Sequence, residues 1–372
     1  MTVPKLKIVK LKKEFDNGSV AAVDGIDLSV ETGETLALLG PSGCGKSTTL
    51  NMIVGLDDPT SGDIQINGQS IVHVPPGRRN VGLVFQDYAV FTSMTVRQNF
   101  AFGLEVRHTQ KSKIAQAVNE VAELLNMSDR LDARAKDLGG SELQRVAIGR
   151  TLVTKPEILL LDEPLSNLET AARLAVRNEL RRLQSEIGLT IIYVTHDQIE
   201  ALSLANRIAV MRAGKILQVE KASVIFNRPD HLFVAGFLGS PPMNLLRGRL
   251  EAGENTMVFR KLSFSLPVNN VTATDSAVPK GFFTLGIRPE LLQIVPKETA
   301  PLVGQVRLVE PRGSEVVLTV EVASEKLKVV APSVGHIKEG EAVGLFIDPD
   351  SLVFFDGNTN RLCDLCLSGR PN

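Results

Sequence analysis

Residues 40–47 read Gly-Pro-Ser-Gly-Cys-Gly-Lys-Ser and fit the pattern G-x-x-x-x-G-K-[ST]. A short apolar run, 35–39, leads into this stretch, and Leu50, Ile53 and Val54 follow it at helical spacing. This order predicts a strand, a glycine-rich loop and a helix. In such a loop the backbone N–H groups point inward and the helix N-terminus adds partial positive charge, so the loop can hold phosphate oxygens. The competing interpretation, a plain glycine-rich turn before a helix, does not account for the matching context.

The side chains of this loop indicate a nucleotide and a magnesium ion as ligands. Lys46 can reach the terminal phosphates, and the hydroxyl group of Ser47 can hold Mg²⁺. The residues that we expect to contact the nucleotide here are Gly40, Pro41, Ser42, Gly43, Cys44, Gly45, Lys46, Ser47 and Thr48.

The composition is that of an ordinary folded protein of two domains. The chain has 372 residues, of which 43% are apolar and 22% are charged. Its net charge of −1 lacks the basic excess of nucleic-acid binders, so we expect no nucleic-acid partner. No apolar run has the length of a membrane span, and no apolar stretch follows the N-terminal lysines, so we expect neither a membrane helix nor a signal peptide.

The three cysteines favour a reducing, cytoplasmic setting. Cys44 lies in the glycine-rich loop, and Cys363 and Cys366 form a single C-x-x-C near the C-terminus. One such pair supplies too few ligands for a structural zinc site. We interpret both as free thiols.

The first part of the chain, 1–235, is predicted to be an α/β domain. Residues 158–161 and 190–195 are continuous apolar runs, as expected of strands buried on both faces. Between them, apolar residues recur at helical spacing at Leu180, Leu183 and Ile187. Gly188, which follows, is a natural helix end. This alternation predicts a parallel sheet covered by helices. The stretch from about 87 to 155 reads as a helical subdomain inserted into it.

The remaining residues, 236–372, are predicted to form a small all-β domain. Pro241 and Pro242 mark a turn-rich boundary. Beyond them, short β-branched runs at 306–309, 316–320 and 327–330 are separated by glycine and proline.

Two adjacent acids form the second candidate site. Asp162 and Glu163 follow the apolar strand that ends at Leu161. Asp162 is placed to hold Mg²⁺, and Glu163 is placed to polarise a water molecule for attack on the γ-phosphate. The alternative is a strand end whose acids are merely solvated.

Two further polar residues follow predicted strands. His196 ends the run 193–196, at the sheet edge where ligands bind in open α/β folds, and we assign it a contact to the γ-phosphate. A structural or exposed histidine is the alternative. Gln86 ends the run 84–86 before the helical insertion. We interpret it as a sensor that links the nucleotide to that insertion and as a third magnesium ligand, beside Ser47 and Asp162.

Together these motifs resemble those of the ATP-binding subunits of ABC transporters, in the carbohydrate-importer branch typified by the maltose and glycerol-3-phosphate ATPases. The resemblance covers nearly the whole chain, and the matching stretches are 40–47, 84–86, 161–168, 193–197, 233–244 and 285–290. The last two stretches are specific to the branch. Residues 233–244 look like the join to an OB-like (TOBE-type) regulatory domain, and residues 285–290 look like part of that domain.

The resemblance implies an ATPase at the cytoplasmic face of the membrane that drives the uptake of a small solute, most naturally a sugar, a polyol or a glycerol phosphate. Its implied partners are a second ATPase subunit, two membrane-spanning permease subunits and, indirectly, a solute-binding protein. Phe15 matches the aromatic residue that stacks on adenine. The rival interpretations are a soluble ABC ATPase and a regulatory interaction protein that does not itself drive transport.

The chain departs from the family in the signature loop, which meets the ATP held by the partner subunit. The usual Leu-Ser-Gly-Gly-Gln is here Leu138-Gly139-Gly140-Ser141-Glu142. Loss of the serine hydroxyl would remove a hydrogen bond worth about 1.5–3 kcal/mol. Glu142 should weaken phosphate binding unless it points away, and Ser141 is expected to be a helix N-cap. Glu169 also replaces the usual aspartate.

These departures allow two arrangements. In the first, the chain forms a homodimer with two slow but working sites. In the second, it pairs with a sister ATPase whose intact signature loop completes the site of this chain.

Overall fold

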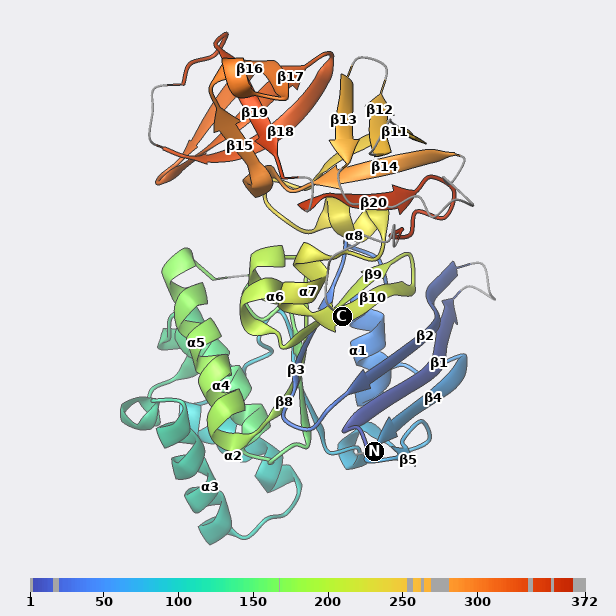
Figure 1. Ribbon diagram of the computed structural model, residues 1–372. Coiled ribbons are helices and arrows are strands. Elements are labelled where there is room, and N and C mark those ends of the chain that lie inside the picture. The colour runs from blue at the N-terminus through green and yellow to red at the C-terminus, as the bar shows by residue number, and fades with distance from the viewer. Residues whose placement is uncertain are drawn as a thin grey trace. The chain divides into compact units, whose positions relative to one another are not determined.

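The computed structural model describes residues 3–15, 20–166, 168–252, 257–261, 264–268, 281–333, 337–348 and 351–363. The chain divides into two compact units, 1–223 and 224–372 (Figure 1). The predicted domain boundary at 235/236 lies farther along the chain, and it stays a prediction.

The first unit is built on a six-stranded sheet. Its strand order is β10-β9-β3-β8-β7-β6, and all neighbours are parallel except β10 and β9. The strands are β3 (Thr35–Leu39), β6 (Val81–Val84), β7 (Ile158–Asp162), β8 (Thr190–Thr195), β9 (Arg207–Arg212) and β10 (Lys215–Lys221). Residues 158–161 of β7 and every residue of β8 are buried, which confirms that the two continuous apolar runs are strands covered on both faces.

Helices cover both sides of this sheet. These helices are α1 (Lys46–Val54), α5 (Thr170–Ile187) and α6 (Gln198–Leu204); α7 (Ala222–Asn227) begins at the end of this unit and runs into the second. In Figure 1, α1 and α5 lie on opposite sides of β3 and β8. The predicted end of α5 is confirmed, because Gly188 caps it at a φ of 62°. Of the predicted stripe, Leu180 and Leu183 are buried, whereas Ile187 is exposed.

A second, antiparallel sheet of the same unit was not predicted. Its order is β2-β1-β4-β5, with β1 (Leu6–Phe15), β2 (Val20–Val30), β4 (Ser61–Ile66) and β5 (Gln69–Ser70). One hydrophobic core joins it to α1 and to the central sheet; it includes Leu6, Ile8, Leu36, Leu38 and Leu50. As a result α1 is packed between two sheets, which fixes the loop at its N-terminus.

Three helices lie between β6 and β7 in the sequence: α2 (Val96–Val106), α3 (Lys111–Leu124) and α4 (Gly140–Leu152). Short 3₁₀ turns at Ser128–Arg130 and Ala135–Asp137 accompany them, and another at Pro76–Arg78 precedes β6. A capping box of Thr95 and Gln98 starts α2.

The second unit has two five-stranded antiparallel sheets, as predicted for an all-β domain. The first has the order β13-β12-β11-β14-β20, with β11 (Asn244–Ala252), β12 (Met257–Lys261), β13 (Phe264–Val268), β14 (Phe282–Ile287) and β20 (Val353–Asp356). The second has the order β15-β19-β16-β17-β18, with β15 (Leu292–Val295), β16 (Leu302–Arg312), β17 (Glu315–Val322), β18 (Glu325–Pro332) and β19 (Ala342–Ile347).

Side chains from both sheets form one core, which includes Phe259, Phe283, Val306 and Val320. The short helix α8 (Leu232–Phe237) and 3₁₀ turns at Pro289–Leu291 and Lys297–Thr299 complete this unit. Within the described part of the chain, no helix combines the length and the apolar character needed to cross a membrane.

Candidate functional site

The loop between β3 and α1 has a backbone that only glycine can adopt at one position. Gly45 caps α1 at a φ of 104°, and a Cβ atom there would lie 2.3 Å from the carbonyl oxygen of Ala22. Gly43 also has a positive φ, of 75°. The loop therefore curls into α1 with the helix N-terminus facing its interior, which is the geometry that binds phosphate.

The side chain of Lys46 is folded into this loop. Only 6% of the residue is exposed, and Nζ donates hydrogen bonds to the carbonyl oxygens of Gly40 (2.8 Å) and Pro41 (2.9 Å). The ammonium group thus lies where phosphate oxygens would be held. Burial raises the pKa of the Cys44 thiol, so that this cysteine stays a neutral thiol at physiological pH.

Ser47 and Asp162 meet at the edge of the central sheet although 115 positions separate them in the sequence. The hydroxyl of Ser47 donates to Oδ1 of Asp162 at 3.1 Å. Burial raises the pKa of the Asp162 carboxyl group, and the hydrogen bond from Ser47 and the charge of Lys46 only partly oppose this effect. A hydroxyl and one carboxylate fit Mg²⁺, which is commonly held by one or two carboxylates, waters and substrate phosphates.

Glu163 and His196 are also in contact. Oε1 of Glu163 lies 3.0 Å from Nδ1 of His196. Glu163 has a φ of 46°, which is rare for a residue with a side chain, and its N–H donates to the carbonyl oxygen of Val194. Its side chain is only 19% exposed, so the alternative of a merely solvated acid does not describe it. The structure brings together the two residues that the sequence placed at the same sheet edge.

A network that the sequence analysis missed fixes the loop carrying His196. Thr195 donates to Glu200 at 2.7 Å, and it accepts the N–H of Asp197 at 2.9 Å. Oδ1 of Asp197 caps α6 by accepting the N–H groups of Ile199 and Glu200. The spacing Asp197-x-x-Glu200 before an apolar run is a helix-start signal that could have revealed it.

Phe15 is the last residue of β1, and Gln86 lies in the turn two residues after the end of β6. Nε2 of Gln86 lies 3.4 Å from Oγ of Ser166, which itself donates to the carbonyl oxygen of Glu163. The ring of Phe15 is 40% exposed, with Nζ of Lys13 5.0 Å from its centroid. The roles of Gln86 as sensor and magnesium ligand, and of Phe15 in adenine stacking, remain predictions.

The altered residues of the signature loop lie at the N-terminus of α4. The N-cap of α4 is Gly139 and Ser141 lies in the first turn, so the predicted N-cap role of Ser141 is wrong. The reason is that Glu142 already serves the helix start: its Oε2 accepts the N–H of Gly139 at 3.0 Å, and its Oε1 lies 3.3 Å from Nε of Arg130. The carboxylate thus turns back onto the N-terminus of its own helix.

Glu169 and the cysteine pair near the C-terminus were also singled out in the sequence. Glu169 is the N-cap of α5 and makes no side-chain capping bond. Cys363 is half-buried, and Cys366 lies outside the described residues, so the interpretation of this pair stays a prediction.

Family models match most of the chain. The ABC transporter model matches residues 23–166, the MalK OB fold domain matches 239–292 and the TOBE domain matches 285–355. These matches confirm a P-loop ATPase domain followed by an OB-like (TOBE-type) all-β domain.

Curated relatives span nearly the same length. The chain is 40% identical to the xylose/arabinose import ATP-binding protein XacJ of Haloferax volcanii, over 95% of this chain and 94% of that protein. It is 42% identical to the maltose/maltodextrin import ATP-binding protein MalK of Yersinia pestis, over 87% and 88%. It is 39% identical to the sn-glycerol-3-phosphate import ATP-binding protein UgpC 3 of Rhizobium etli, over 96% and 99%.

Solved structures agree on the fold. The cbiO1 protein of Clostridium perfringens, part of an ABC transporter complex, superposes with a TM-score of 0.56 at 28% identity, over 60% of this chain and 91% of that chain. An ATP-binding cassette of an ABC transporter in its ADP conformation gives the same TM-score at 24% identity, over 61% and 96%, and shows the fold alone.

Proposed function

This chain belongs to the ATP-binding subunits of ABC importers, and from that premise we propose that it uses ATP hydrolysis to drive uptake of a sugar, a polyol or a glycerol phosphate. Members of the family bind ATP with Mg²⁺ and hydrolyse it. The observation that carries the proposal is the meeting of Ser47 with Asp162 and of Glu163 with His196 at one sheet edge. The solute class rests on the relatives, which are named for sugars and for glycerol 3-phosphate.

We assign the hydrolytic step to residues of this edge. Glu163 takes a proton from the attacking water, whose oxygen forms a bond to the γ-phosphorus while the bond to the bridging oxygen of ADP breaks. The contact with His196 uses Oε1 of Glu163 and leaves Oε2 to accept that proton. His196 is then held next to the γ-phosphate.

Phosphate binding falls to the loop and its neighbours. Lys46 and the loop N–H groups hold the phosphate oxygens, and Ser47 and Asp162 would hold Mg²⁺. When bound, the ion supplies positive charge that stabilises the transferring phosphoryl group.

Importer ATP-binding subunits work with membrane permease subunits and a substrate-binding protein. We propose that this chain is peripheral at the cytoplasmic face, next to two permease subunits and a second ATPase. The rival assignment, a soluble ABC ATPase outside transport, is not favoured, because relatives matching over nearly the whole chain are named as import proteins. A regulatory role of the second unit is compatible with transport.

Uptake by the assembled transporter tests the proposed solute class. The chain would be purified with its membrane subunits, reconstituted in vesicles and supplied with its binding protein. We expect one of xylose, maltose, glycerol or glycerol 3-phosphate, or a close analogue of these, to accelerate ATP hydrolysis and to cross the membrane. Acceleration by amino acids or metal ions alone would contradict the solute class and leave the ATPase assignment intact.

The position of Glu142 makes the signature loop a poor phosphate ligand for a partner subunit. Its carboxylate occupies the N–H of Gly139 and places a negative charge at the α4 N-terminus, where a partner's phosphate would bind. Restoring the usual loop with Gly139→Ser, Ser141→Gly and Glu142→Gln removes this negative charge and adds a hydroxyl group. If the chain forms a homodimer, its steady-state ATPase should rise about 10- to 150-fold, which corresponds to about 1.5–3 kcal/mol.

The rate of the wild-type chain, measured alone and in the whole transporter, distinguishes the two proposed arrangements. If a sister ATPase supplies the working signature loop, the isolated wild-type chain is much slower than the whole transporter, and the triple variant restores activity to the isolated chain. No gain in either setting would contradict the proposed weakness of this loop. The matched control is Glu186→Gln, which removes an exposed carboxylate on α5 and should change neither rate.

A further inference from the structure

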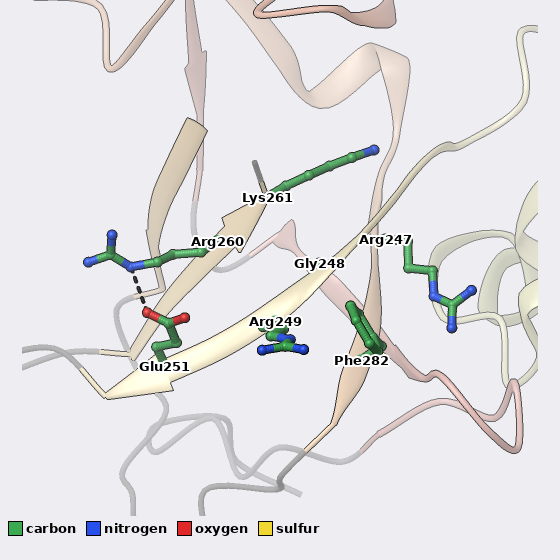
Figure 2. A pocket seen from close by; sticks show the side chains of 7 residues that line it. All are labelled: Arg247, Gly248, Arg249, Glu251, Arg260, Lys261 and Phe282. Atoms are coloured by element: carbon green, nitrogen blue, oxygen red, sulfur yellow. Dashed lines mark ion pairs between the residues drawn. The ribbon is translucent and has the colours of Figure 1, made fainter. Parts of the chain in front are cut away.

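The outer face of the first sheet of the second unit carries a basic pocket that the ATPase does not use. Its lining, which we call the arginine pocket, consists of Arg247, Gly248, Arg249, Glu251, Arg260, Lys261 and Phe282, and its volume is about 690 Å³ (Figure 2). Binding pockets for small molecules are commonly about 300–1,000 Å³. The size therefore suits a small ligand.

Strand register gathers the three arginines, Glu251 and Phe282 on one face, whereas Lys261 directly follows Arg260 and points to the other face. Arg249 of β11 pairs with Arg260 of β12 on one side and with Phe282 of β14 on the other. Paired residues of antiparallel strands point to the same face, and so does Arg247, two positions away. The neighbouring residue Phe283 points to the opposite face, where it is buried in the core.

Two of the four cations in the pocket have an acidic partner. Nε of Arg260 lies 2.8 Å from Glu251, and Nζ of Lys261 lies 2.7 Å from Glu325. Arg247 and Arg249 make no ion pair with any residue that the structure describes. Arg249 also lies directly opposite Arg260 in the strand register, and Glu251 neutralises only the charge of Arg260.

The two unpaired guanidinium groups are held by an aromatic ring. They lie 5.0 Å (Arg247) and 4.7 Å (Arg249) from the centroid of Phe282, which is 46% exposed. Figure 2 shows them on either side of that ring. Stacking restricts their rotamers and leaves their N–H groups available at the edges, so that less conformational entropy is lost when an anion binds.

We propose that the arginine pocket binds a small phosphorylated molecule, whose phosphate oxygens accept paired hydrogen bonds from Arg247 and Arg249. Guanidinium groups match the geometry of phosphate oxygens in this way. Nucleic acid fits less well, because base stacking needs a free aromatic face. The guanidinium groups of Arg247 and Arg249 already lie over the ring of Phe282. The site lies in the regulatory unit and is independent of the hydrolytic residues.

Calorimetric titration of the full-length chain tests this proposal. The nucleotide site is left empty, because an ATP analogue carries phosphates that would themselves compete for the arginine pocket, and a parallel titration of the Lys46→Ala variant shows any contribution of the P-loop. Inorganic phosphate and glucose 6-phosphate are titrated separately, which distinguishes the free anion from an organic phosphate. We expect at least one of them to bind, and the affinity to fall as the salt concentration rises.

Variants of the pocket identify the residues responsible. Arg247→Ala and Arg249→Ala should each weaken binding at least about tenfold. Arg249→Lys should also weaken binding, because an ammonium group cannot donate the two parallel hydrogen bonds of a planar guanidinium group. Arg307→Ala is the control, since Arg307 is an exposed arginine of the same unit that pairs with Glu321. Melting curves check that each variant is folded.

Three results would overturn the proposal. One is that neither anion binds the wild-type chain. Another is that binding is unchanged in the folded Arg247→Ala/Arg249→Ala double variant. The third is that only a single-stranded oligonucleotide or an acidic peptide binds. Because binding and not hydrolysis is measured, such a failure would leave the ATPase assignment untouched.

Discussion

Glu163→Gln is expected to bind Mg·ATP with nearly the affinity of the wild type and to hydrolyse it at least about 100-fold more slowly, the scale of a lost general base. Glutamine keeps the size of the side chain, and its amide group can still contact Nδ1 of His196, but it cannot take a proton from water. Equilibrium binding of a fluorescent ATP analogue and phosphate release by the assembled transporter measure the two quantities.

The control for this variant is again Glu186→Gln, whose exposed carboxylate lies far along α5. A turnover rate of Glu163→Gln equal to that of the wild type would remove Glu163 from the mechanism. A loss of ATP affinity that fully accounts for the slower rate would show that the side chain supports binding and not proton transfer.

Lys46→Ala should lose most of the affinity for Mg·ATP, by about 10- to 150-fold, because charge-assisted hydrogen bonds contribute about 1.5–3 kcal/mol. The ammonium group is buried and aimed into the loop, so no neighbouring cation of the described loop can replace it. The loss of binding should abolish solute uptake into vesicles at ATP concentrations that saturate the wild type.

Lys113→Ala is the matched control, since Lys113 lies exposed on α3 in the helical subdomain. Melting curves for both variants distinguish loss of binding from loss of folding. Unchanged ATP affinity in a folded Lys46→Ala variant would contradict the proposed role of the loop.

The motifs and their immediate surroundings were predictable because local rules decide them. A glycine loop between a buried strand and a helix, and acids at the end of another buried strand, specify where phosphate and magnesium chemistry belongs. Parallel strands bring their carboxyl ends to one edge, which is why Ser47 and Asp162 meet across 115 positions. The same reasoning placed Glu163 and His196 together.

Other features depend on pairings that no local pattern encodes. In the antiparallel sheet of β1, β2, β4 and β5, the pairings β1–β2 and β4–β5 are local hairpins, but the β1–β4 pairing that joins them crosses a long stretch of sequence and was not predicted. The predicted cap at Ser141 was wrong because the longer side chain of Glu142 reaches back to the N–H of Gly139. The arginine pocket was not visible because Phe282 joins Arg249 only through strand register.

The way Lys46 is held has a consequence for how quickly and tightly a triphosphate binds. Two carbonyl oxygens of its own loop fix the side chain, so its rotational freedom is lost when the chain folds and not when the ligand arrives. An incoming anion therefore meets a charge already in position and exchanges carbonyl contacts for stronger ionic ones. Burying a cation in this way costs folding free energy, so the loop is less stable than it could be but holds a binding site that is already in position.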